Sequence, residues 1–238
     1  GCMRDSKFFD QVKDTLLFKT TKGDHVTLAE YMAKNEGKMG KKVVYTNDEK
    51  RQAASIALYE QKEIDVVVLD ALIDLNFASF MEYSAGIEDL KFARVDADAA
   101  TFSEDDKLEG DEKEAVEKEE KTLDELFKKS TGNKDLTVKL QKLTDPDLPA
   151  LLVQDEQGRR FSEMGKIYGQ DFKMPEQHTL VLNRQNEVVM GLLNSDDEER
   201  RGMIAAQLYD LARMSTRPLE KDEITAFLAR SNKLLKML

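Results

Sequence analysis

The sequence predicts two units of mixed α and β structure. The first is an α/β unit with a short parallel β-α-β core, and the second is an α+β unit with a three-stranded sheet and a helix pair. Residues 42–69 place a helical segment between two short apolar runs. Residues 103–121 are almost entirely polar, and beyond them three strand-like segments precede a run of helical ones. We therefore expect units over 1–102 and 122–238, joined by an acidic connector over 103–121.

In the first unit, apolar residues at helical spacing predict an opening helix over 8–18. Thr27 and Glu30 have the spacing of a capping box, which predicts the start of a second short helix. The runs 43–45 and 66–69 are rich in β-branched residues and flank a helical segment. They predict two parallel strands joined by a right-handed crossover. A helix over 70–83 and a short strand over 91–96 complete the unit.

The connector holds ten acidic and four basic residues, which is typical of a solvated helix or linker and less so of an acidic binding tail. In the second unit, Thr122 and Glu125 predict a capping box that opens a helix, and Gly132 predicts its end. Strict alternation over 134–143 predicts a half-buried strand, and 148–154 and 178–183 predict two more. A short helix over 186–194 and longer helices over 197–214 and 219–238 follow.

Composition excludes several classes of function. The 238 residues carry a net charge of −11, whereas nucleic-acid binders cluster Lys and Arg, so we expect no nucleic-acid partner. No apolar run approaches the roughly 20 residues of a membrane span, and the start lacks a signal peptide, so we expect no membrane partner. One Cys excludes an internal disulfide framework and fits a reducing cytoplasm.

Catalytic motifs are missing from the sequence. It contains no glycine-rich phosphate loop, metalloprotease helix or nucleophile elbow. Asp96 and Asp98 could form a metal pair but are more simply solvated carboxylates, and the two His residues have no Ser or Cys partner. A small ligand could bind at the strand ends near Thr46 and Asp70, although the loop there has no glycine. We expect no catalytic residue, no cofactor and no metal in this chain.

The last two helices carry more apolar surface than a three-stranded sheet needs. An apolar stripe must be buried, either on the chain's own sheet in a monomeric scaffold or against a second copy in a four-helix bundle. We favour a homodimer. The candidate interface residues are Ile204, Leu208, Leu211, Ile224, Phe227, Leu228, Leu234, Leu235 and Leu238.

The Met-rich segment, "FSEMGKIYGQDFKMP" at 161–175, combines large apolar side chains with two glycines. Each glycine lowers helix stability by about 1 kcal/mol relative to Ala. The segment could complete a core, or its adaptable Met side chains could bind varied apolar partners. The candidate binding residues are Phe161, Met164, Ile167, Tyr168, Phe172 and Met174.

An ordered series of segments over about residues 7–238 resembles the heat-shock protein 90 family in its bacterial form. "KLQKLTDPDLPALLVQDEQGRRFSEMGKIYG" is similar to the family's strand, turn, strand and exposed Met-containing helix. "QLYDLARM" and "NKLL" are similar to its closing helix pair, and "LAEYMAKN" and "IDVVVLDALID" to the end of its middle domain. The family's Asn-Pro-x-His segment departs here, because Arg184 and Asn186 follow Asn183 without the Pro and His.

The resemblance implies the C-terminal part of a middle domain followed by a C-terminal dimerisation domain. It implies that the whole protein is a dimeric stress-response chaperone that binds and hydrolyses ATP with magnesium. The ATP-binding domain has no counterpart in this chain, so we expect the chain to be part of a longer protein and not to be an enzyme itself. The exposed Met-containing helix is expected to contact non-native client proteins.

Overall fold

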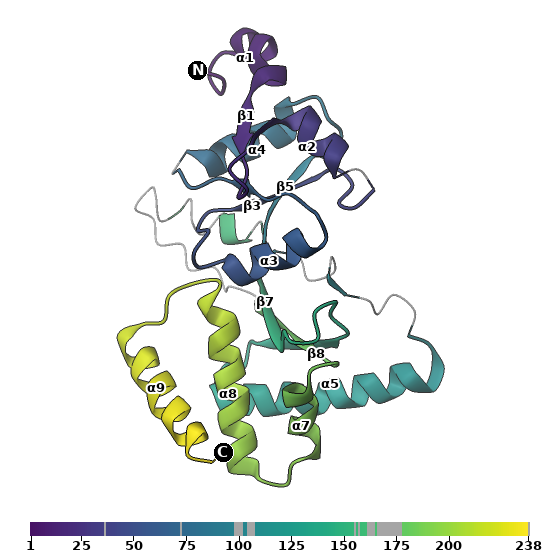
Figure 1. Ribbon diagram of the computed structural model, residues 1–238, viewed down its shortest axis with the longest axis vertical. Helices are drawn as coiled ribbons and strands as arrows, with labels where there is room; N and C mark the ends of the chain where they lie inside the picture. Colours follow the sequence, from purple (N-terminus) through teal and green to yellow (C-terminus); the bar gives the residue numbers. More distant parts are fainter. Residues whose placement is uncertain are drawn as a thin grey trace. The chain divides into compact units, whose positions relative to one another are not determined.

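The computed structural model describes residues 1–35, 37–71, 73–97, 102–103, 108–154, 156, 158–160, 165 and 178–237. The chain divides into two compact units, Gly1–Asp98 and Ala99–Leu238. Figure 1 labels the helices and strands of both units. The general α/β composition expected from the sequence is confirmed, with one parallel sheet in the first unit and one mixed sheet in the second.

The first unit is built on a three-stranded parallel sheet with the strand order β4-β3-β5. The central strand β3 (Lys42–Thr46) pairs in parallel with β4 (Val67–Val68) and with β5 (Lys91–Arg94). Helix α3 (Ala53–Gln61) connects β3 to β4. The predicted parallel β-α-β arrangement is therefore confirmed, and β5 corresponds to the further strand expected over 91–96.

The start of the first unit differs from the prediction. Helix α1 (Ser6–Val12) is followed by the 3-10 turn η1 (Lys13–Thr15) and by strand β1 (Leu17–Lys19), so a helix over 8–18 is wrong beyond Val12. Strand β1 pairs antiparallel with β2 (His25–Thr27). Within β1 burial alternates, because Phe18 enters the core at 6% exposed while Leu17 is 61% exposed. Pairing with β2 overrides the local helical spacing.

Two further helices of this unit agree with the sequence. Helix α2 (Leu28–Lys34) begins at the predicted capping box, in which the Glu30 amide donates to Thr27 Oγ1 at 3.2 Å and Glu30 Oε2 accepts from the Thr27 amide at 2.7 Å. Helix α4 (Asp74–Ser84) corresponds to the helix expected over 70–83. Both contribute to the core, α2 through Leu28 and Tyr31 and α4 through Ala78 and Met81.

A buried polar group fixes α2 to the parallel sheet. The Tyr31 hydroxyl donates to the Asp65 carbonyl at 2.9 Å and accepts from the Val44 amide at 2.9 Å, and burial raises the pKa of this phenol. Burial alone would raise the pKa of the Asp65 carboxyl. Hydrogen bonds from Lys22, at 2.7 Å, and from Lys34 outweigh that effect and hold its pKa below the usual range. Asp65 is therefore a paired carboxylate inside the unit.

The second unit is built on a mixed sheet with the strand order β6-β8-β7. The middle strand β8 (His178–Asn183) pairs in parallel with β6 (Thr137–Gln141) and antiparallel with β7 (Ala150–Gln154). The three strands expected from the sequence are confirmed. Their inward side chains form one core with side chains from the helices of the unit: Leu123, Phe127, Leu136, Val138, Leu140, Leu152, Leu180, Leu182, Val189, Leu192, Ala205, Leu208, Tyr209 and Ala212.

The described part of this unit also contains the helices α5 (Gly110–Thr131), α7 (Glu187–Asn194), α8 (Glu198–Met214) and α9 (Lys221–Leu235). Helices α7, α8 and α9 correspond to the three predicted from the sequence. Gly132 ends α5 in a left-handed conformation with φ 69°, as expected.

The predicted helix start at Thr122 is wrong. Helix α5 begins at Gly110, and Thr122 lies inside it, where its hydroxyl donates to the Lys118 carbonyl at 3.0 Å. The charged residues from 110 onward are rich in Glu and Lys, which have good helix propensity, so the helix extends through them. The second half of the acidic stretch is therefore the first half of α5.

Helix α5 also covers the outer edge of strand β6. Glu120 Oε2 accepts from the Leu140 amide at 2.9 Å, and Asp124 Oδ1 accepts from the Val138 amide at 3.3 Å. These two carboxylates lie one helical turn apart and satisfy two amides that would otherwise face outward from an edge strand. Another strand could pair with β6 at these amides only if the carboxylates of Glu120 and Asp124 were displaced.

Asn183, at the end of β8, holds the loop between β6 and β7. It is fully buried, and its Oδ1 accepts from the Leu143 amide at 3.2 Å and the Gln185 amide at 3.0 Å. Its Nδ2 donates to the carbonyls of Asp145 at 2.8 Å and Leu148 at 2.9 Å. All the hydrogen-bonding positions of this amide are used, so the loop geometry depends on it.

We expect Asn183→Ala to lower the free energy of unfolding by about 3 kcal/mol, because it leaves several buried backbone groups without a partner. Urea unfolding followed by far-ultraviolet circular dichroism at fixed protein concentration measures this change. Asn194→Ala is the matched control, since the Asn194 side chain is exposed and makes one bond, to the Met190 carbonyl. Equal midpoints and slopes for the two variants would contradict the role given to Asn183.

Candidate functional site

Helices α8 and α9 carry the surface that the sequence singled out. Helix α8 turns Ala205, Leu208, Tyr209 and Ala212 into the core and packs against α5 and β7. Helix α9 packs against α8, on the side of α8 away from the sheet (Figure 1). All fifteen residues of α9 are described, and none of them is buried. The last helix therefore lies on the unit without entering its core.

The predicted interface residues differ in exposure. Four side chains are markedly exposed for apolar residues: Leu211 at 46%, Ile224 at 45%, Leu228 at 54% and Leu235 at 65%. Ile204, Phe227 and Leu234 are half-buried, and Leu208 is buried in the core. Leu238 lies outside the described residues. An exposed apolar row of this kind on two adjacent helices is typical of a surface that contacts another molecule.

An open groove of about 240 Å³ continues this surface toward α7. Leu208 belongs to its lining, and so do Ile204 and Gln207 from α8 and Leu234 and Leu235 from α9. Val188 of α7, half exposed, and Arg200 of α8 complete the lining. The groove is mainly apolar, and its shape depends on where α9 lies against α8.

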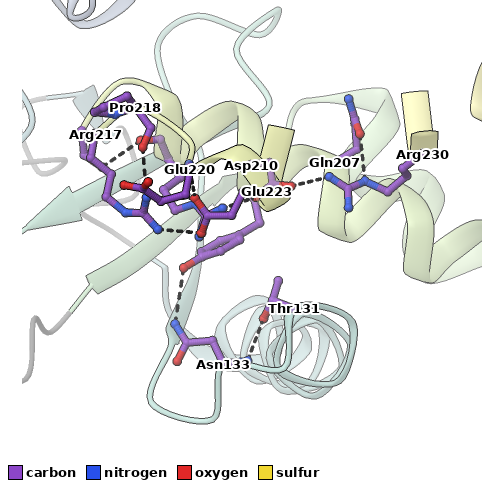
Figure 2. A network of polar contacts seen from close by, with 12 residues as sticks. Thr131, Asn133, Gln207, Asp210, Arg217, Pro218, Glu220, Glu223 and Arg230 are labelled. Atoms are coloured by element: carbon purple, nitrogen blue, oxygen red, sulfur yellow. Dashed lines mark hydrogen bonds and ion pairs between the residues drawn. The ribbon is translucent and has the colours of Figure 1, made fainter. Parts of the chain in front are cut away.

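The contacts between α8 and α9 that are shown in Figure 2 are polar. Asp210 accepts hydrogen bonds from Arg213, at 2.7 Å, and from Arg230 of α9. Arg230 Nε also donates to Gln207 Oε1 at 2.8 Å, and Gln207 Nε2 donates to Ser231 Oγ at 2.8 Å. The side chains of Asp210 and Arg230 are only 12% and 16% exposed, so water screens this pair less than a surface pair.

Glu223, in the first turn of α9, forms a second polar centre. Its Oε1 lies 2.9 Å from Arg213 Nη1 and 2.8 Å from Arg217 Nη2, and its Oε2 accepts from Arg217 Nη1 at 2.9 Å. The Glu220 amide donates to the same Oε2 at 2.8 Å in a capping box. The hydrogen bonds from Arg217, with the Glu220 amide and the charge of Arg213, lower the pKa of Glu223 to about 2 despite desolvation.

Sequence reasoning identified the apolar row and missed these polar centres. Two signals were available. Asp210 and Arg213 have i, i+3 spacing on α8, and Glu220 and Glu223 have the spacing of a capping box with Glu as the first residue. The contacts between helices, such as Asp210 with Arg230 and Arg213 with Glu223, join residues on either side of the turn between α8 and α9, and no local sequence pattern predicts them.

The candidate client-contacting residues, Phe161, Met164, Ile167, Tyr168, Phe172 and Met174, all lie outside the described residues. Asp98 of the possible metal pair does too. Asp96 is buried and pairs with Arg94, whose Nε donates to it at 2.6 Å. Among the residues that the structure describes, no group of three or more His, Cys, Asp or Glu side chains is placed to hold a metal ion.

The strand ends considered for a small ligand make internal hydrogen bonds. The Thr46 hydroxyl donates to Gln52 Oε1 at 2.6 Å and accepts from the Asp48 amide at 3.2 Å, and Thr46 itself is buried. Asp70, which follows β4 in the sequence, is exposed. These bonds use the polar groups of Thr46 within the protein itself.

Over the described helices, none has the length and hydropathy required to cross a bilayer.

Fold and surface together define an α/β unit and an α+β unit, the second of which ends in a helix pair with exposed apolar side chains. The family model described as Hsp90 protein matches residues 1–238. The chain therefore belongs to the Hsp90 family, and the resemblance found in the sequence is confirmed.

Bacterial relatives named chaperone protein HtpG are similar to this chain. The protein of Bacteroides fragilis (strain 638R) is 29% identical over 219 residues, covering 86% of this chain and 31% of the relative. That of Bacteroides thetaiotaomicron is 29% identical over 213 residues, covering 84% and 30%, and that of Wolinella succinogenes is 27% identical over 247 residues, covering 99% and 38%. The chain thus spans about a third of the length of these curated relatives.

Proposed function

We propose that this chain is the dimerisation and client-contacting part of a molecular chaperone, and that α8 and α9 pair with the same helices of a second copy. The observation that carries this proposal is that α9 buries none of its residues in its own chain while α8 and α9 expose four large apolar side chains.

The division between polar and apolar contacts favours a second copy as the partner. Within the chain, α9 meets α8 through ion pairs and hydrogen bonds, and the apolar side chains Leu211, Ile224, Leu228 and Leu235 remain exposed. Burying the exposed half of a Leu or Ile side chain is worth about 1 kcal/mol. An isologous contact buries each of these residues twice, once on each copy, so a modest apolar row gains considerable driving force.

For the whole protein we propose an ATP-dependent chaperone that acts in the cytoplasm. ATP and magnesium would bind in parts of the protein that this chain does not contain, and the chain itself would not be an enzyme. The family membership and the names of the relatives support this proposal. A dimer joined at this unit would tether two ATPase arms and raise the effective concentration at which they meet.

We propose the Met-rich segment as the surface that contacts non-native proteins. Met side chains are unbranched and polarizable, so they adapt to apolar surfaces of different shape. A segment interrupted by Gly165 and Gly169 has little helix propensity of its own, which suits weak binding of varied clients. Nucleic acids and membranes are not among the proposed partners.

Leu228→Glu tests the dimer. It places charges in the centre of the apolar row, so we expect the mass in solution to fall from about twice 27.1 kDa to 27.1 kDa at micromolar concentration. Light scattering measures the mass. Ala226→Glu, on the opposite side of α9, is the matched control and should leave the dimer intact. A wild-type chain of 27.1 kDa at every concentration would instead support a monomeric scaffold.

The Met-rich segment is tested by the double variant Met164→Ser and Ile167→Ser. We expect its free energy of unfolding to stay within about 0.5 kcal/mol of the wild type, as for surface positions. Capture of a chemically unfolded protein, measured by suppression of its light scattering, should weaken. A large loss of stability with unchanged capture would show that the segment completes a core.

A further inference from the structure

The attachment of α9 to α8 has two polar centres, and Glu223 occupies the one at the start of α9. Its carboxylate accepts from Arg213, from both terminal nitrogens of Arg217, and from the Glu220 amide, all between 2.8 and 2.9 Å. A carboxylate has about four acceptor positions, so this one is saturated. The bidentate geometry with Arg217 also restricts the direction from which α9 can approach.

The second centre, around Asp210 and Arg230, lies two turns further along α9. Arg230 reaches both Asp210 and Gln207, and Gln207 reaches Ser231. At the far end Lys233 pairs with Glu199, and both of these side chains are more than half exposed. Since solvent weakens exposed pairs, the two inner centres account for most of the polar attachment.

Apolar packing of α9 is limited in the isolated chain, since Phe227 and Leu234 are only half-buried. No residue of α9 is buried, and the core of the second unit contains side chains of α8 but none of the described side chains of α9. The groove that borders the apolar row takes part of its lining from Leu234 and Leu235 of α9, so its shape requires a docked α9. The geometry of the apolar surface therefore depends on the polar attachment.

We infer that Glu223 is a positioning residue for dimerisation: its carboxylate, held by Arg213 and Arg217, docks α9 on α8 and so arranges the apolar surface that a second copy meets. This inference rests on the proposed dimer. It adds a regulatory property, because assembly then responds to acid and to salt through a group that lies outside the apolar row.

Several charged or titratable groups surround Glu223. Arg213 and Arg217 face its carboxylate, and Asp210 shares Arg213. The negative charge of Glu220 acts on Arg217, the Glu220 amide also binds Glu223, and the neutral Tyr209 ring lies 5.2 Å from the Arg213 guanidinium. Because the pKa of Glu223 is lowered from 4.5 to about 2, its contribution is complete above about pH 4.5 and is lost as pH falls toward 2. Acid should therefore undock α9, and alkali should not.

Glu223→Gln is the main test. At pH 7 and low salt we expect the dissociation constant of the dimer to rise about tenfold, because a charge-assisted contact with two arginines becomes a neutral one. Asp222→Asn is the matched control: it removes the neighbouring carboxylate from the same helical turn, and it should change the constant less than about twofold. Sedimentation over a concentration series measures both.

Two dependences separate positioning from a general loss of stability. The ratio of the dissociation constants of Glu223→Gln and wild type should shrink toward one as pH falls from 4.5 to 2, because the undocked wild-type carboxyl takes up a proton over this range while the docked carboxylate stays charged until pH approaches 2. It should also shrink in 1 M salt, where charges are screened within about 3 Å. A ratio that stays constant across both series would overturn the inference, as would equal constants for Glu223→Gln and Asp222→Asn.

Hydrogen exchange at the amides of α9 tests docking independently of the dimer. In the wild type and in Asp222→Asn, we expect slower exchange over α9 than in Glu223→Gln when each is measured under monomeric conditions. If the wild type never dimerises, the proposed function fails, and faster exchange in Glu223→Gln would still support the docking role. If the dimer forms but exchange and assembly are the same in both variants, the positioning role alone is wrong.

Discussion

Helix α8 packs on two sides at once, and the second unit depends on that double role. One side delivers Ala205, Leu208, Tyr209 and Ala212 to the core, and the other side holds α9 through Asp210, Arg213 and Gln207. Because α8 contacts the core on one side and α9 on the other, it fixes the position of α9 relative to the sheet. The proposed contact between copies would therefore be tied directly to the core of each unit.

Much of the fold followed from local pattern. Runs of β-branched residues predicted the parallel strands β3 and β4, and strict alternation of apolar and polar residues predicted β6. The spacing of Thr27 and Glu30 identified a real capping box, and the apolar row on the last two helices was visible as helical periodicity. The β1–β2 pair and the start of α5 did not follow. Pairing between strands prevailed over local spacing in the first case, and helix propensity prevailed over the capping signal in the second. Leu17 and Phe18 fit the spacing of an apolar helix face, but they lie in β1, which pairs with β2. Thr122 has the sequence context of a helix start, but the charged residues before it already belong to α5.

The candidate site was half predictable for the same reason. Apolar side chains on one face of a helix recur at a regular spacing that the sequence shows. Ion pairs between two helices join residues at no regular spacing, so the sequence does not indicate them. Asp210 pairs with Arg230, and Arg213 pairs with Glu223, because the turn between α8 and α9 places the two helices side by side. The sequence thus indicates the exposed apolar surface that is proposed to meet a partner, and the structure adds the ion pairs that orient it.

The cover that α5 places over strand β6 has a consequence for the proposed contact with unfolded chains. Non-native polypeptides are rich in segments able to extend a sheet, and an accessible border strand would recruit them irreversibly. With Glu120 and Asp124 occupying the outward amides of Leu140 and Val138, that border offers no template. In the proposed role, contact with clients would then depend on side chains, and β6 would not be extended by the segments of unfolded chains that tend to form fibres.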